Sequence, residues 1–129
     1  MKKFTFFVII VLLAGITLFS TQASGQTKTL LKTDLSGFEG KEGIVYTATI
    51  PVGLTGQKHY HPGYQFSYIL EGSIIMNMEG KPPATYKAGD AFYIPPRQVH
   101  FPQNIGTIPV KIISFWLAEK GEPTNIPVK

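Results

Sequence analysis

Residues 53–72 read GLTGQKHYHPGYQFSYILEG and residues 89–104 read GDAFYIPPRQVHFPQN, and these two stretches decide the fold. They contain all three histidines of the chain, His59, His61 and His100. Residues two apart on a strand point to the same face, so His59 and His61 can both face inward while Tyr60 faces the other way. If the strand that carries His100 lies opposite, the three imidazoles can share one metal ion and leave positions open for a ligand.

The pattern around these stretches predicts a domain that is almost entirely β. From Gln26 onward there is no helical periodicity of useful length, and short apolar or alternating segments recur between turns rich in Gly, Pro and Asn. Many short strands in about 100 residues favour one sandwich or barrel, with jelly rolls among the fitting architectures. We expect an irregular strap or frayed end over residues 119–129. The predicted strands are residues 29–32, 44–50, 57–61, 65–70, 73–78, 85–86, 91–94, 99–102 and 110–117.

The spacing of particular residues resembles the two sequence motifs of the cupin family. The first runs Gly53-x5-His59-x-His61-x3-Gln65-x6-Gly72, with Gln65 where Glu is usual. The second runs Gly89-x5-Pro95-x-Arg97-x2-His100-x3-Asn104, with Arg97 where Gly is usual. The chain is therefore similar to a small single-domain cupin, which implies a jelly-roll β-barrel over residues 26–129.

This resemblance implies a divalent transition metal, of which Fe, Mn, Ni, Zn and Cu are all compatible with imidazole ligands. His59, His61 and His100 are the expected ligands, with Gln65 as a fourth. An amide oxygen can bind a metal, but it is neutral and weaker than a carboxylate, and it cannot accept a proton as a general base. The alternative is that the histidines pack and hydrogen-bond inside the barrel without metal.

Three functions fit this site. The leading expectation is a metal-dependent dioxygenase or other oxidoreductase acting on a small organic molecule, because that chemistry needs no base at Gln65. A non-enzymatic ligand-binding cupin has nearly equal weight. A metal-dependent sugar isomerase or lyase is the third, and the missing carboxylate argues against it. The sequence alone does not decide whether the chain is an enzyme.

Two further expectations concern the surface. Arg97 needs only an ordinary turn conformation, and a solvated loop residue is favoured over a clamp for a substrate carboxylate. If Gln65 faces inward, Phe66, Tyr68 and Leu70 face the opposite side, where they can serve sheet packing or a dimer interface. Small cupins are often dimers, so the resemblance implies a homodimer.

The N-terminal segment reads as a cleavable signal peptide over residues 1–25. Lys2 and Lys3 precede an apolar run over residues 4–19, which is shorter than the roughly 20 residues of a membrane-spanning helix. Small residues follow and favour cleavage after Gly25, with cleavage after Ala23 and an uncleaved anchor as alternatives. The expected location is periplasmic or secreted, with no stable membrane span after cleavage.

Composition excludes several classes of partner and of stabilisation. The chain has no cysteine, so neither a lipid-modified N-terminal cysteine nor a disulfide framework is available. Without Lys2 and Lys3, ten Lys and Arg face eight Asp and Glu, and the basic residues are scattered singly. Nucleic acid is therefore an unexpected partner, and a small molecule is the expected one.

Overall fold

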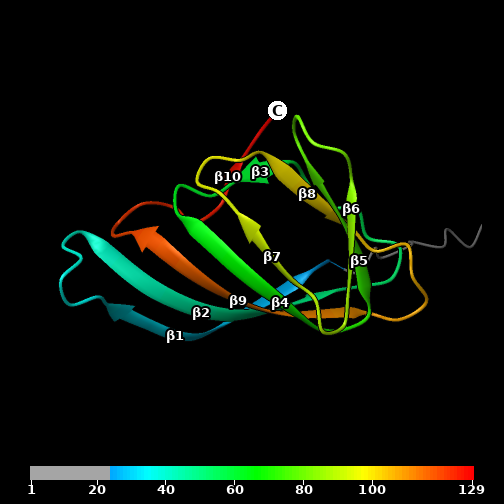
Figure 1. Cartoon of the computed structure of the whole chain (residues 1–129), viewed down its shortest axis with the longest axis horizontal. Coiled ribbons are helices and arrows are strands. Elements are labelled where there is room, and N and C mark those ends of the chain that lie inside the picture. The colour runs from blue at the N-terminus through cyan, green and yellow to red at the C-terminus, as the bar shows by residue number, and fades with distance from the viewer. Residues whose placement is uncertain (1–23) are drawn as a thin grey trace, which may run out of the picture.

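The computed structural model describes residues 24–129, which form ten strands in two antiparallel sheets that face each other (Figure 1). One sheet has the order β1-β2-β9-β4-β7 and the other has the order β10-β3-β8-β5-β6. Within the described residues, no helix is long and apolar enough to cross a membrane. The strands are β1 (Gln26–Asp34), β2 (Lys41–Ile50), β3 (His59–Tyr60), β4 (Tyr64–Glu71), β5 (Ser73–Met78), β6 (Ala84–Lys87), β7 (Ala91–Ile94), β8 (His100–Gln103), β9 (Val110–Glu119) and β10 (Ile126–Pro127).

The chain passes repeatedly from one sheet to the other, as a jelly roll does. It crosses between β3 and β4, between β4 and β5, and again on either side of β8. The all-β jelly-roll prediction is confirmed. The crossings bring β3 and β8 together as neighbours in one sheet, with His59 paired to His100.

Strand alternation decides which side chains face the interior. On β4, Gln65 and Ser67 are buried, whereas Phe66 is 50% and Tyr68 is 45% exposed on the outer face. The two sets alternate because successive strand residues point to opposite faces of a sheet. The predicted outward direction of Phe66, Tyr68 and Leu70 is confirmed, and the homodimer remains a prediction.

The hydrophobic core lies between the two sheets and continues into the wall of a cavity. Its members are mainly branched aliphatic side chains from both sheets, and Ile69 and Val110 have no exposed surface. Such side chains suit strands and pack across a sheet interface. The core consists of Ile50, Ile69, Ile74, Met76, Phe92, Ile94, Val110 and Ile112.

The C-terminal tail differs from its prediction. Residues 119–129 were expected to form a strap or a frayed end, but Ile126 and Pro127 form β10 and pair with Tyr60 and His59. Val128 N also donates to the Lys58 carbonyl at 2.9 Å. The tail is thus held as an edge strand beside the histidine pair. The sequence does not predict this strand, because two residues that pair only through their backbone leave no hydrophobic pattern.

The expectation that Arg97 adopts an ordinary turn is wrong. Arg97 has a φ of 61°, in the left-handed region that favours glycine, which accounts for the usual Gly at this motif position. Its N–H donates to the His61 carbonyl at 2.7 Å, so the strained turn is fastened to the segment that carries the histidines. The guanidinium lies 6.0 Å from the centre of the Tyr60 ring, within cation–π range.

Asn104 fastens the turn that follows β8. The side chain is 1% exposed, and its Nδ2 donates to the carbonyls of Ile50 and Ile108, both at 3.0 Å. Its Oδ1 accepts from the Gly106 N–H at 3.0 Å. These bonds fix the turn that connects β8 in one sheet with β9 in the other.

We expect Asn104→Ala to lower the free energy of unfolding by about 2–4 kcal/mol, because three hydrogen bonds are lost and buried backbone groups are left unpaired. Urea denaturation followed by circular dichroism measures this effect. Asn77→Ala is the control, since Asn77 makes one partly buried side-chain bond, to Gln103, and should cost about 1 kcal/mol. Equal losses in the two variants would contradict the role given to Asn104.

The predicted signal peptide lies almost entirely outside the described residues, which begin at Ser24.

Candidate metal centre

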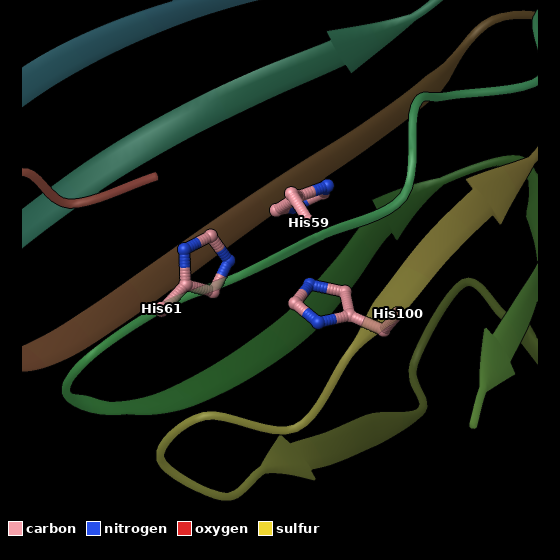
Figure 2. Close-up of side chains that lie close together, drawn as sticks. All are labelled: His59, His61 and His100. Atoms are coloured by element: carbon pink, nitrogen blue, oxygen red, sulfur yellow. The ribbon is translucent and has the colours of Figure 1, made fainter. Parts of the chain in front are cut away.

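The three histidines converge on one space inside the barrel (Figure 2). His59 lies on β3, His61 follows it in the turn to β4, and His100 opens β8. The ring centres of His59 and His100 are 4.3 Å apart, and His61 lies 4.9 Å from each of the other two rings. One ligand atom from each residue lies within 4.8 Å of the others. Two ligands of an ion with bonds of about 2.0–2.1 Å can be up to about 4.2 Å apart, so small ring movements suffice to bring all three onto one ion.

Backbone carbonyls fix the orientation of every ring. The Nδ1 of His59 bonds to the Gln57 carbonyl at 2.8 Å, and the Nδ1 of His100 bonds to the Gln98 carbonyl at 2.8 Å. The Nδ1 of His61 bonds to the Thr124 carbonyl at 2.5 Å. A carbonyl oxygen can only accept, so each Nδ1 carries a proton, and any of these rings in its neutral form has its free lone pair on Nε2. Histidine ligands of metals are typically oriented in this way.

Burial keeps two of the rings neutral. It lowers the pKa of His61 to about 4, with the neighbouring His100 and His59 adding to the effect and the Thr124 carbonyl opposing it. Burial likewise lowers the pKa of His100 to about 4, against the bond to the Gln98 carbonyl. At neutral pH both rings are therefore unprotonated, the state in which imidazole binds metals.

Gln65 faces the same cavity from β4, with only 6% of the residue exposed. Its Nε2 donates to Ser67 Oγ at 2.9 Å, and Ser67 Oγ is bonded to Ser114 Oγ at 2.8 Å. Its Oε1 is buried and has no hydrogen-bond partner among the described residues. A buried carbonyl oxygen without a partner is costly, so this atom is available to a ligand that can supply positive charge.

Tyr46 and Trp116 form the aromatic wall behind His61. The Trp116 ring centre lies 4.5 Å from that of His61 and 4.5 Å from that of Tyr46. Burial raises the pKa of Tyr46 to about 12, and contacts of its hydroxyl with Ser114, Trp116 and Gln65 offset this only in part. Trp116 Nε1 is buried and has no hydrogen-bond partner among the described residues, so its contact with the Tyr46 hydroxyl is not a hydrogen bond. Tyr46 is therefore a protonated phenol at neutral pH.

The histidines and Gln65 line a cavity of about 480 Å³, a size typical of small-molecule sites. The lining combines apolar side chains of the core with polar groups, which include the histidines and Gln65 and, on β1, Gln26, Thr27, Thr29 and Lys32. The apolar lining includes Ala48, Ile50, Leu54, Met76, Phe92 and Ile112.

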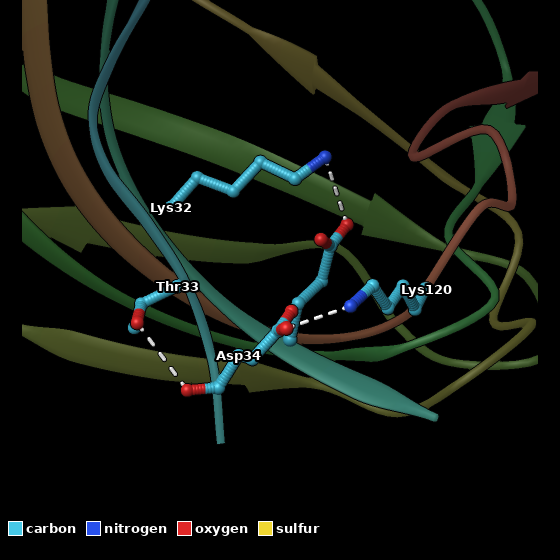
Figure 3. A network of polar contacts seen from close by, with 5 residues as sticks. Lys32, Thr33, Asp34 and Lys120 are labelled. Carbon is cyan, nitrogen blue, oxygen red and sulfur yellow. Dashed lines mark hydrogen bonds and ion pairs between the residues drawn. The ribbon is translucent and has the colours of Figure 1, made fainter. Parts of the chain in front are cut away.

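Two ion pairs lie at the β1 side of the barrel, where Lys32 also lines the cavity (Figure 3). Lys32 Nζ lies 3.0 Å from Glu42 Oε1, and Lys120 Nζ lies 2.7 Å from Asp34 Oδ2. Glu42 is almost fully buried, whereas the Lys32 side chain is 58% exposed. Lys32 is thus the charged residue at the edge of the cavity.

The structure brings together all four residues that the sequence singled out, and it adds groups that the sequence could not reveal. The carbonyl of Thr124 orients His61 from the far end of the chain, 63 residues away. No sequence signal marks it, because every residue carries a backbone carbonyl. Arg97, by contrast, does not line the cavity, so its interpretation as a substrate clamp gains no support.

Comparison with known proteins gives a family and a fold. Residues 46–116 match the cupin domain family. An uncharacterized protein of Methanocaldococcus jannaschii is 35% identical over 77 residues, which are 59% of this chain and 61% of the relative.

Solved structures agree with this match. A DMSP lyase of Ruegeria pomeroyi is 26% identical, with a TM-score of 0.61 over 67% of this chain and 43% of the lyase. A Klebsiella pneumoniae protein with a double-stranded beta-helix domain is 19% identical, with a TM-score of 0.67 over 84% of this chain and 89% of that one. The chain thus spans about three fifths of the archaeal relative and less than half of the lyase.

Proposed function

Because this chain belongs to the cupin domain family, we propose that it is an exported metal-binding cupin that acts on a small organic molecule, with dioxygenase chemistry as the leading reaction class. His59, His61 and His100 are the proposed ligands of a divalent transition metal. The observation that carries the proposal is the set of three Nδ1 bonds to backbone carbonyls, which leaves three Nε2 lone pairs for one ion. The bond of His61 to the Thr124 carbonyl, 63 residues away, shows that this orientation is not only a local contact of the strands.

Gln65 fits as the fourth ligand. Its Nε2 is committed to Ser67, and its buried Oε1 is without a partner among the described residues. A bound cation would replace the hydrogen bond that this buried oxygen lacks, whereas a dry apolar pocket would leave the oxygen unpaired. The set of three imidazoles and one amide is compatible with Fe, Mn, Ni, Zn or Cu.

When bound, such an ion supplies a Lewis acid and, for redox-active metals, a centre for reaction with dioxygen. The protein residues orient the ligands, exclude water and provide an apolar wall for the organic molecule. No carboxylate lines the cavity among the described residues. The Tyr46 phenol is also a poor proton acceptor, because burial raises its pKa to about 12. A reaction that begins with proton abstraction by a side chain is therefore disfavoured.

The likeness to the DMSP lyase, at 26% identity, makes a metal-dependent lyase the second candidate. It ranks below oxidation because an elimination needs a proton acceptor, and no carboxylate lines the cavity among the described residues. The two reaction classes differ in their demand for dioxygen. An oxidation consumes oxygen in proportion to substrate, whereas a lyase cleaves its substrate at the same rate in air and under nitrogen.

Elemental analysis and oxygen uptake test the proposal in sequence. The protein is purified without chelators and without a histidine tag, and about one equivalent of a transition metal is expected. Oxygen uptake is then followed with catechols, diketones and thiols, and DMSP cleavage is followed under nitrogen. A protein that neither carries metal nor takes it up from solution contradicts the metal site. Metal binding without any turnover identifies a ligand-binding cupin instead.

We expect Ser67→Ala to weaken metal affinity by about tenfold, because the amide of Gln65 loses the partner that orients its Oε1. Competition with a chromophoric chelator measures the affinity. The exposed Ser36, replaced with alanine, is the control and should leave affinity unchanged. Unchanged affinity in Ser67→Ala, in a variant that folds normally, would remove Gln65 from the proposed ligand set.

Export rests on the N-terminal sequence alone. Expression of the full chain in a bacterium should place the protein outside the cytoplasm, and mass spectrometry should give a mature N-terminus at Gln26. Intact Met1 in a membrane fraction would favour the uncleaved anchor, and intact Met1 in the cytoplasm would contradict export.

A further inference from the structure

The charge of the cavity lining indicates what kind of molecule the site accepts. Among the described residues that line the cavity there is no aspartate or glutamate, and Lys32 carries the one formal charge. Glu42 pairs with Lys32 at 3.0 Å from outside the lining, so the lining offers no acidic group and its one formal positive charge is already neutralised.

The proposed metal ligands add no negative charge either. Three neutral imidazoles and one neutral amide leave the whole charge of a divalent ion uncompensated. A buried charge without a counter-charge is costly, particularly beside apolar walls. In a cupin with Glu at the position of Gln65 the protein itself supplies one negative charge, whereas here it must come from the bound molecule.

The apolar part of the lining indicates what the rest of the molecule is. Ile50, Met76, Phe92 and Ile112 face the cavity from the hydrophobic core, and Leu54 packs against them. These side chains offer contact to hydrocarbon and no hydrogen bond. Gln26, Thr27 and Thr29 of β1 also line the cavity of about 480 Å³, so the apolar contact is confined to its core side. A molecule that contacts both the metal and this core side combines a charged head with an apolar body.

We infer that the site selects a small carboxylate with an apolar body, its negative charge at the histidine end and its hydrocarbon part against the Ile50, Met76 and Phe92 wall. The inference rests on the proposed metal site and goes beyond it, because it names the class of ligand. Gln65 is the specificity-determining residue, since its neutrality leaves room for the charge of the ligand.

The chain contains a reporter for this binding. Trp116 is its sole tryptophan, lines the cavity and lies 4.5 Å from the His61 ring centre. Its fluorescence should respond to a ligand at the histidine end. The zinc-loaded protein is titrated with 4-methylpentanoate and with 4-methylpentanamide, which match in size and apolar body but differ in charge. The carboxylate is expected to bind at least about tenfold more tightly than the amide.

Gln65→Glu provides the decisive variant, because it should change two affinities in opposite directions. Zinc affinity should rise by about tenfold or more, and 4-methylpentanoate affinity should fall by about tenfold or more, since the new carboxylate replaces the charge of the ligand. Gln103→Glu is the matched control, because it adds the same charge outside the cavity lining and should change neither affinity.

Two failures are distinguishable. If the protein binds zinc but shows no preference for the acid over the amide, the inference is overturned and the metal site stands. The same holds if Gln65→Glu leaves the affinity for 4-methylpentanoate unchanged. A protein that binds no zinc would contradict the proposed metal site, and the inference would fall with it.

Discussion

Replacing His100 with alanine is expected to lower the affinity for a divalent ion by at least about 100-fold. Apparent binding free energies of structural zinc sites, about 10–16 kcal/mol, are shared among four ligands, so one ligand accounts for about 3 kcal/mol. His100 is 2% exposed and faces both other rings, so no other side chain can take its place without rearrangement of the barrel. Isothermal titration with zinc measures the loss.

Tyr60→Phe is the matched control for this experiment. Tyr60 lies between His59 and His61 in sequence but is not part of the cavity lining. It keeps its ring and its contact with Arg97, so zinc affinity should stay within about twofold of the original. Retention of full zinc affinity in a folded His100→Ala variant would refute the three-histidine site.

Gly63→Ala is expected to produce the largest loss of stability, well above 3 kcal/mol. A Cβ at this position would lie 2.2 Å from the Leu117 carbonyl oxygen and 2.9 Å from the Ala118 Cα. Both are backbone atoms of β9, so relief requires the strand itself to move. Overpacking in a well-packed site already costs about 1–3 kcal/mol, and backbone displacement adds to this. Chemical denaturation measures the difference, and low yield of folded protein is the extreme form of the same result.

Gly80→Ala separates steric contact from backbone conformation. Gly80 has a φ of 78°, but a Cβ there would meet nothing within 4 Å. Its substitution should cost about 1–2 kcal/mol, from the left-handed conformation alone. If Gly63→Ala lowered the free energy of unfolding no more than Gly80→Ala does, the steric account of Gly63 would be wrong.

The strands that the sequence predicts most accurately are short apolar segments with clear turns on both sides. Ser73–Met78 and Ala91–Ile94 agree residue for residue, because Gly72 and Gly89-Asp90 mark where pairing begins. β1 is longer than predicted, since its residues pair with β2 over nearly its whole length while remaining exposed. Hydrophobic patterning cannot detect a strand whose side chains all remain exposed.

The side chains of the candidate site were predictable from the sequence, whereas its backbone groups were not. Strand alternation and motif spacing identified His59, His61, Gln65 and His100, and the structure brings all of them to one cavity. The Thr124 carbonyl was not predictable, because its role depends on where the tail pairs and not on its side chain. The left-handed turn at Arg97 was not predictable for a different reason, namely that a residue other than glycine rarely adopts a positive φ.

The most direct test of the metal site is an NMR spectrum of the histidine ring nitrogens in the metal-free protein at neutral pH, followed by zinc titration. With three histidines in the chain and no tag, every ring can be followed individually. The proposal predicts that all three rings carry their proton on Nδ1 and that one equivalent of zinc shifts all three Nε2 signals together. A ring protonated on Nε2, or a ring whose signals zinc leaves unchanged, would contradict it.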